Sequence, residues 1–268
     1  MYSWYLDAVS ANWGAAMSDD LNTLFPISFT VKLGVKQFHQ AMFTRQFDLL
    51  GQGFSIHKVL SLLENQFKFV QFRSHLDISA IENKETRVYQ SMNLKDEYQN
   101  KYATNAKRLI KKSIKNYSFK KVNCIDELID LVNENVAHKI KEFTTENIIK
   151  LKNLMIAACD NDKGETLAVF EGNEIVGAGF FLKDKSRVTY LKGASTDLAK
   201  KNGAMYGLMN FAFDSYKNDY EMFDFGGSNV EGVATFYKKF GALDNAYYNY
   251  IINDLPVWFN FLKKLKRQ

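Results

Sequence analysis

The chain has 268 residues, of which 46% are hydrophobic, 15% are aromatic and only two are proline. This composition excludes a disordered chain, and the length allows one large or two moderate domains with full cores. The 35 basic and 30 acidic residues give a mild formal net charge of +5, so positive charge matters here through local clusters.

The first part of the chain is typical of a small α/β module. Ser55 can cap a short helix that runs to about Asn65, with Val59, Leu60 and Leu63 on one face. Strand-like runs bounded by turn residues surround this helix, at residues 24–31, 35–39, 45–50, 67–72 and 86–92. We therefore predict a first domain over residues 1–93.

Residues 94–116 predict a long helix with a basic end. The segment has no glycine or proline, and aromatic and aliphatic residues recur in it at near-helical spacing. Its basic residues complement a helix C-terminal dipole and equally suit an anionic partner; they are Lys107, Arg108, Lys111, Lys112 and Lys115. A solvated face and a polyanion-binding face both remain open. We expect residues 94–117 to be a basic helix that connects two domains.

The remainder, residues 118–268, predicts a second α/β domain. The expected order is a strand at 118–122, helices at 125–136 and 144–159, and a three-stranded meander at 166–171, 174–182 and 187–193. A helix at 203–216, a strand at 222–225, a helix at 230–240, a strand at 247–252 and a last helix at 255–266 follow.

Residues 222–242 are the most informative segment for function. Their sequence, MFDFGGSNVEGVATFYKKFGA, predicts a buried strand, a turn at Gly226, Gly227 and Ser228, and an amphipathic helix. This order gathers free backbone N–H groups at one place, which suits a carbonyl, a carboxylate or a phosphate of a substrate.

Metal binding and membrane insertion are not indicated. Cys124 and Cys159 form no CxxC pair and the four histidines are scattered, so no metal-ligand spacing is present. The sequence begins with neither a basic segment nor a long apolar run, and no stretch approaches the roughly 20 apolar residues that span a bilayer. We expect a cytoplasmic protein with no metal and no membrane span.

The order of elements in the second half resembles the GNAT N-acyltransferase fold. Phe236, Tyr237, Lys239 and Gly241 match a segment that GNAT proteins often carry after their fifth strand, whereas Val230, Val233 and Ala242 depart from it. Residues 223–228 and 236–241, together with NAKRLIKKS at 105–113, resemble the branch that contains Fem-type aminoacyl transferases and related bacterial proteins. The resemblance implies a mixed α/β sheet with tandem GNAT-like domains, the N-terminal one divergent and abbreviated.

The resemblance also implies an activity: transfer of an acyl group, acetyl above all, from acyl-CoA to an amine of a small metabolite, peptide or cell-envelope precursor. Tyr237 would then protonate the departing thiolate, unless its ring only packs against the sheet. Asp224 could act as a general base, anchor the substrate amine or cap the turn. Ser228 could bind substrate with Gly226 and Gly227, or cap the following helix.

The same resemblance places the donor's pyrophosphate at a loop that leads into a helix. Here that segment offers positive charge and N–H donors at Lys200, Lys201, Asn202, Gly203 and Ala204. Two alternatives remain. In the first, the donor is aminoacyl-tRNA and the acceptor a peptidoglycan precursor, as in Fem-type relatives, and the basic helix at 107–115 could meet a tRNA backbone. In the second, the chain is a non-catalytic binding protein with the GNAT fold.

Overall fold

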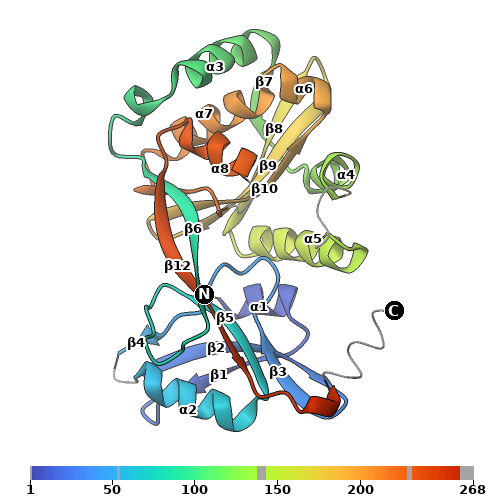
Figure 1. Cartoon of the computed structure of the whole chain (residues 1–268). Helices are drawn as coiled ribbons and strands as arrows, with labels where there is room; N and C mark the ends of the chain where they lie inside the picture. The colour runs from blue at the N-terminus through green and yellow to red at the C-terminus, as the bar shows by residue number, and fades with distance from the viewer. Residues whose placement is uncertain (1, 53–54, 138–142, 228–230, 260–268) are drawn as a thin grey trace. The chain divides into compact units, whose positions relative to one another are not determined.

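The computed structural model describes residues 2–52, 55–137, 143–227 and 231–259 (Figure 1). The chain forms two compact units, Met1–Arg87 with Ala246–Gln268, and Val88–Asn245. The boundaries between them lie within strands β6 (Lys84–Asn93) and β12 (Leu243–Asn253). These boundaries differ from those of the predicted domains, which were residues 1–93, 94–117 and 118–268. The end of the chain returns to the first unit, and the basic helix belongs to the second.

The first unit is a sheet with helix α2 packed on one face. Its strands follow the order β1-β2-β3-β5-β12, with β4 beside β2, and only β3 and β5 run parallel. The elements are α1 (Ser3–Val9), β1 (Trp13–Met17), β2 (Thr23–Lys32), β3 (Val35–His39), β4 (Leu50–Gly51), α2 (Ile56–Gln66) and β5 (Phe69–Ser74). The predicted helix cap is confirmed, because the Ser55 side chain accepts a hydrogen bond from the Lys58 N–H.

One predicted strand of the first unit, residues 45–50, is wrong. Only Leu50 of this run lies in a strand, and the rest is irregular. Asp48 explains the difference, since its carboxylate accepts hydrogen bonds from the Ser74 hydroxyl and the His75 N–H. With one backbone bond, from the Phe47 N–H to the Arg73 carbonyl, these side-chain bonds hold the run beside β5 without a regular ladder.

The second unit has helices on both faces of a mixed sheet (Figure 1). Its strand order is β6-β11-β10-β9-β8-β7, in which only β10 and β11 run parallel. After β6 the elements are η1 (Tyr98–Lys101), α3 (Thr104–Asn116), β7 (Ser118–Lys121), α4 (Ile125–Asn135), α5 (Thr145–Asp160), β8 (Gly164–Glu171), β9 (Glu174–Asp184), β10 (Arg187–Ser195), α6 (Asp197–Lys201), α7 (Ala204–Tyr216), β11 (Met222–Asp224) and α8 (Glu231–Lys238).

The predicted meander is confirmed as β8, β9 and β10, and the predicted strand–turn–helix as β11 and α8. The core between the sheet and α7 is rich in aromatic rings, among them Phe181, Phe213 and Phe223. Apolar alternation along the strands drives this packing, because each strand places alternate residues on the face that α7 covers. Among the described residues, no helix is long and apolar enough to cross a bilayer.

Helix α3 packs against α7 within the second unit. Ala106, Ile110 and Ser113 are buried on its inner face. The two helices approach closely at Gly207, where an added Cβ would overlap Ser113 Oγ and the Phe119 ring. The inner face of the basic helix is therefore part of the second unit's core.

Candidate active site

The ladder between β10 and β11 ends early. The two strands pair at three positions only, from Arg187↔Met222 to Thr189↔Asp224. β10 continues to Ser195 and pairs over that length with β9. Within the described part of the chain, no strand pairs with the other edge of β10 after Thr189. Backbone N–H and C=O groups on that edge therefore have no ladder partner there within the described residues.

A bulge in β10 decides which side chains share a face. The register shifts at Leu191, so that Tyr190 and Lys192 pair with adjacent residues of β9. Adjacent residues of a strand point to opposite faces, and Lys192 therefore lies on the face opposite to Tyr190. Arg187 lies on that same face, because it is an odd number of residues before Tyr190 in the regular part of the strand. The bulge thus places Lys192 and Arg187 on one side of the sheet.

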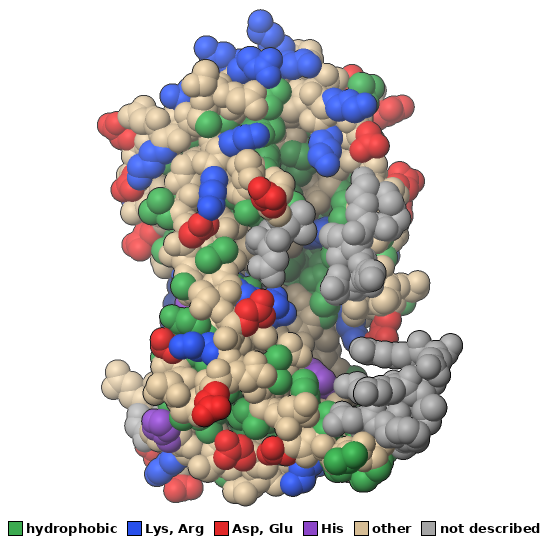
Figure 2. All heavy atoms as spheres, in the orientation of Figure 1, with side chains coloured by type: hydrophobic (Ala, Val, Ile, Leu, Met, Phe, Trp, Pro, Cys, Tyr) green, Lys and Arg blue, Asp and Glu red, His purple; other side chains and the backbone are tan. Residues whose placement is uncertain are grey.

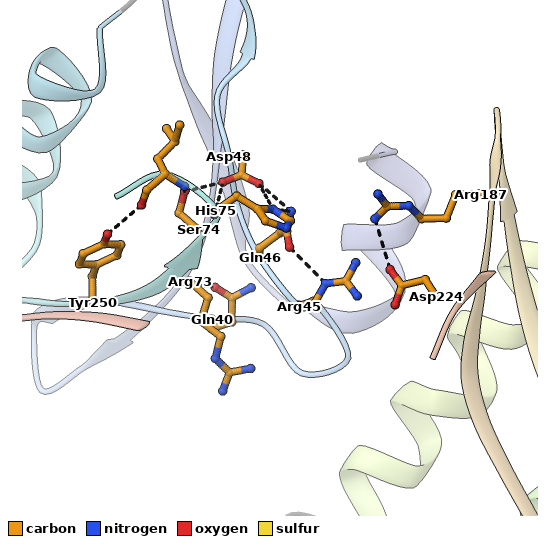
Figure 3. A network of polar contacts seen from close by, with 11 residues as sticks. Gln40, Arg45, Gln46, Asp48, Arg73, Ser74, His75, Arg187, Asp224 and Tyr250 are labelled. Carbon is orange, nitrogen blue, oxygen red and sulfur yellow. Dashed lines mark hydrogen bonds and ion pairs between the residues drawn. The ribbon is translucent and has the colours of Figure 1, made fainter. Parts of the chain in front are cut away.

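Asp224, the last residue of β11, is fully buried on this side. Its Oδ1 accepts a hydrogen bond from the Gly226 N–H at 2.9 Å, and its Oδ2 lies 3.2 Å from Arg187 Nη1 (Figure 3). The rings of Phe223 and Phe225 point the other way and contact Phe213. Of the roles predicted for Asp224, capping of the turn is the one that these contacts supply directly.

The turn after β11 requires its two glycines. Gly226 and Gly227 both have φ +78°, which favours glycine. A Cβ at Gly226 would lie 2.7 Å from the Tyr190 carbonyl oxygen, and one at Gly227 would lie 2.8 Å from Tyr89 Cβ. Their first role is to let the chain turn beside β10. Ser228, the third predicted residue of this turn, lies outside the described residues.

Tyr237 lies on the opposite face, in α8. Only 6% of it is exposed, and its ring packs 4.7 Å from Phe225 and 6.4 Å from Tyr190, centroid to centroid. Burial, with a contribution from the charge of Asp224, raises the pKa of Tyr237 above its ordinary value. The phenol is therefore protonated at neutral pH and can donate a hydrogen bond or a proton. Packing and a chemical role are both compatible with this position.

Lys192 is a candidate that sequence reasoning missed. Its Nζ lies 4.1 Å from the centroid of the Phe143 ring, a cation–π contact. Burial lowers the pKa of Lys192 to about 8. A sizeable fraction of this lysine is therefore neutral near pH 7.5, as a general base must be. The signal in the sequence was one lysine within an otherwise apolar and small run, TYLKGA, next to the edge of the ladder.

The predicted phosphate-binding residues lie after β10, around the junction of two helices. The short helix α6, which the sequence did not reveal, ends at Lys201, and Gly203 with φ +86° begins α7. The side chains of Lys200 and Lys201 are exposed, whereas Gly203 and Ala204 are buried. The N-terminus of α7 carries a partial positive charge at this junction.

The basic face of α3 lies beside the same junction. Lys112 Nζ donates a hydrogen bond to Asn202 Oδ1 at 2.9 Å. A Cβ at Gly203 would lie 3.1 Å from the Leu109 carbonyl oxygen, so the two segments are in contact. Figure 2 shows Lys and Arg side chains gathered over α3 at the top of the view; the exposed ones on this helix are Lys107, Arg108, Lys111, Lys112 and Lys115. Two clusters that the sequence analysis treated separately thus form one positive surface.

The structure brings together some predicted residues and separates others. Asp224, Gly226 and Tyr237 lie around the end of β11, with the ring of Tyr237 and the carboxylate of Asp224 on opposite faces. Lys200 and Asn202 lie beyond the far end of β10. Within the described ranges, no group of three or more His, Cys, Asp and Glu side chains could hold a metal ion.

Comparison with known proteins identifies the fold through structures only. No family model matches the sequence, and no curated protein matches it. FemX matches over 99% of this chain and 93% of its own, with a TM-score of 0.64 at 12% identity. L-PGS from Bacillus licheniformis matches over 92% of this chain and 86% of its own, with a TM-score of 0.60 at 14% identity.

A tandem GNAT protein from the clavulanic acid biosynthesis pathway also matches, over 94% of this chain and 87% of its own, with a TM-score of 0.54 at 7% identity. At these identities the likeness concerns the fold and not the substrate. The chain therefore has the GNAT-like α/β fold expected from its sequence, shared with structures of the Fem and tandem-GNAT kinds.

Proposed function

We propose that the second unit transfers an acyl group from acyl-CoA to an amine. The observation that carries this proposal is the early end of the β10–β11 ladder. Beyond Thr189, this edge of β10 has no strand paired to it among the described residues. Tyr237 lies on one face of the sheet there and Lys192 on the other. A thioester held along this edge would have a proton donor on one side and a proton acceptor on the other.

The donor's phosphates would bind where β10 leads into α6 and α7. Lys200 and Lys201 offer charge there, and the N-terminus of α7 at Gly203 and Ala204 offers its dipole and N–H groups. Lys112 adds a further cation through its bond to Asn202. The unpaired backbone groups of β10 would hydrogen-bond the amide groups of the coenzyme arm.

The proposed reaction uses Lys192 and Tyr237 as its proton acceptor and proton donor. Neutral Lys192 takes a proton from the acceptor's ammonium group, and the amine nitrogen attacks the thioester carbonyl. The new C–N bond forms, the C–S bond breaks, and the Tyr237 hydroxyl gives its proton to the departing sulfur. The nitrogen gives its second proton to solvent, which leaves a neutral amide, and solvent returns the proton from Lys192 to Tyr237. Alignment of donor and acceptor supplies much of the rate, so neither side chain has to be indispensable.

Calorimetry and a thiol-release assay test this proposal. We expect acetyl-CoA or a longer acyl-CoA to bind, and CoA thiol to appear in the presence of a suitable small amine, peptide or cell-envelope precursor. Tyr237→Phe should lower kcat by roughly 10-fold to 100-fold and leave the Kd for acyl-CoA unchanged. Tyr220→Phe, a partly buried tyrosine outside the site, is the matched control.

Two outcomes would contradict the proposal. Absence of acyl-CoA binding together with absence of thiol release over a panel of amines would remove acyl-CoA as donor. Binding without turnover, and a Tyr237→Phe variant with full cellular function, would favour a non-catalytic binding protein with this fold.

A second candidate, an aminoacyl-tRNA donor with a peptidoglycan precursor as acceptor, is favoured by one observation. Five exposed cations of α3 continue the positive surface of the α6–α7 junction, which suits a longer polyanion. Filter binding to aminoacyl-tRNA should then weaken steeply with salt. Reversing the charge of Lys111 and Lys112 should weaken it further, whereas reversing Lys32 and Lys36 in the first unit should not. No retention at low salt would exclude this donor.

A further inference from the structure

The first unit contains a cross-strand pair of polar residues, Arg73 on β5 and Asn249 on β12. Their neighbours Phe72 and Tyr250 are fully buried in the core, where their rings are in contact. Because successive residues of a strand alternate, Arg73 and Asn249 point to the opposite face. Figure 3 shows the Arg73 side chain leaving β5 on the side away from Ser74.

Each member of this pair has a buried polar atom that makes no hydrogen bond among the described residues. Arg73 Nε is sealed from solvent and makes no hydrogen bond within the described ranges. Asn249 is 2% exposed, and its Oδ1 also has no hydrogen-bond partner. A third buried and unpartnered atom, Gln37 Nε2, belongs to the same face on the neighbouring strand β3.

Polar groups on the other face of this sheet are satisfied by hydrogen bonds. Asp48, on the other face, accepts hydrogen bonds from Ser74 and His75 (Figure 3). Tyr247 and, more weakly, Glu85 attract the charge of Arg73 while Arg87 repels it, and Glu85 Oε2 already accepts a hydrogen bond from Arg87 Nη2 at 2.9 Å. Burial lowers the pKa of Arg73, which shows that the surroundings disfavour its charge.

Leaving such groups unpaired is costly. A buried donor or acceptor without a partner costs about 1–3 kcal/mol, and a charged group costs more. Two adjacent buried polar atoms without hydrogen bonds indicate a ligand that forms those bonds. Selection for stability alone would favour apolar residues at these positions. Arg73 is not fully buried, so a ligand can reach its terminal nitrogens.

We propose that Arg73 and Asn249 bind an oxyanion group, a carboxylate or a phosphate. The planar guanidinium matches two oxygens of either group. The Asn249 amide, once rotated about its last torsion, presents its NH₂ group to the same anion. This site lies in the first unit and does not depend on the acyl transfer proposed for the second.

NMR and thermal unfolding of the full chain test the proposal, with inorganic phosphate and succinate as probes against chloride at equal ionic strength. We expect one of the two anions to shift the side-chain amide resonance of Asn249 and to raise the Tm. The anion that acts at the lower concentration identifies the chemical source. In Arg73→Met the Asn249 shift should need at least tenfold more anion. Arg108→Met, an exposed arginine on α3, is the matched control and should keep the Asn249 shift.

A second readout separates binding from a structural role. In chloride, Arg73→Met should raise the Tm, because it removes an unpaired buried charge. Asn249→Asp should also raise it and should abolish the anion effect, because the new carboxylate takes the ligand's place. A lower Tm in both variants, or an Asn249 resonance in the intact protein that neither anion moves, would overturn the proposal.

Discussion

Lys192 gives the residue-scale prediction that involves pH. Its pKa of about 8 in the folded chain is below the value of about 10.4 expected in the unfolded chain. Between these values the unfolded state binds more protons, so this residue makes stability rise with pH from about 8 to about 10.4. Lys192→Met removes the effect. We expect the variant to be more stable than the wild type below pH 8, and the difference to shrink towards pH 10.4.

Thermal unfolding in steps from pH 7 to pH 10.5 measures this difference. Lys150→Met is the control, because Lys150 is paired with Glu146 on the surface of α5. An equal difference between wild type and Lys192→Met at every pH would show that the folded chain does not disfavour the charge of Lys192.

Gly226 permits a second prediction at this scale. Alanine there has to adopt a positive φ and to place its Cβ 2.7 Å from the Tyr190 carbonyl oxygen. Together these should cost about 2–4 kcal/mol in the free energy of unfolding. Gly172 also has a positive φ, of +62°, but has open space around it, so Gly172→Ala should cost only about 1–2 kcal/mol. Denaturant unfolding of both variants checks the order, and equal losses would contradict the close approach.

At the scale of elements, the crossing of α3 and α7 depends on Gly207. A Cβ there would overlap Ser113 Oγ and the Phe119 ring, so Gly207→Ala should destabilise the second unit by about 1–3 kcal/mol. Gly232, in α8, has nothing within 4 Å of its added Cβ, and Gly232→Ala should stabilise by about 0.5–1 kcal/mol. Opposite signs in urea unfolding are the expected result. A stabilising Gly207→Ala would show that the helices can separate without loss.

Most elements of the second unit could be predicted because their signals are local. Alternating apolar residues mark the meander, and the pair Gly226 and Gly227 marks the turn after β11. Lys192 could not be predicted, since its environment depends on the bulge at Leu191 and on Phe143 from a distant loop. Neither a register shift nor a contact between remote segments is visible in a single sequence.

The pair formed by Arg73 and Asn249 in the first unit could not be predicted either, because it too depends on contacts between remote segments. Arg73 and Asn249 become neighbours only when β12 pairs with β5, and the sequence shows an arginine and an asparagine of ordinary kind. The unit boundaries also follow from this pairing. The strand at 247–252 was predicted as a strand, but its partner was not.

At the scale of the whole molecule, each unit has a carboxylate whose ionised form stabilises the fold. Burial alone would raise the pKa of Asp48, but hydrogen bonds from His75 and Ser74 outweigh it and lower the pKa. Glu165 is similar: burial is outweighed by Lys121 and Lys183, and its pKa is lowered. Groups with a lowered folded pKa stabilise above their unfolded pKa of about 4, and this stability is lost as the pH falls through the folded pKa.

Acid unfolding tests both carboxylates. We expect Asp48→Asn and Glu165→Gln to lower the Tm at pH 7 and to have progressively smaller effects below pH 4. Asp197→Asn, at an exposed position of α6, serves as the control. A loss of Tm that is as large at pH 2.5 as at pH 7 would mean that charge is not the source of the stabilisation.

The return of β12 to the first unit has a consequence for synthesis on the ribosome. The Tyr250 hydroxyl donates a hydrogen bond to the Leu76 carbonyl across 174 residues, so the first unit lacks β12 until that strand has left the exit tunnel. The second unit is one continuous segment and can fold earlier. The second unit can therefore be complete before the first, and the edge of β5 has to remain unpaired, or be shielded by a chaperone, until β12 emerges from the ribosome.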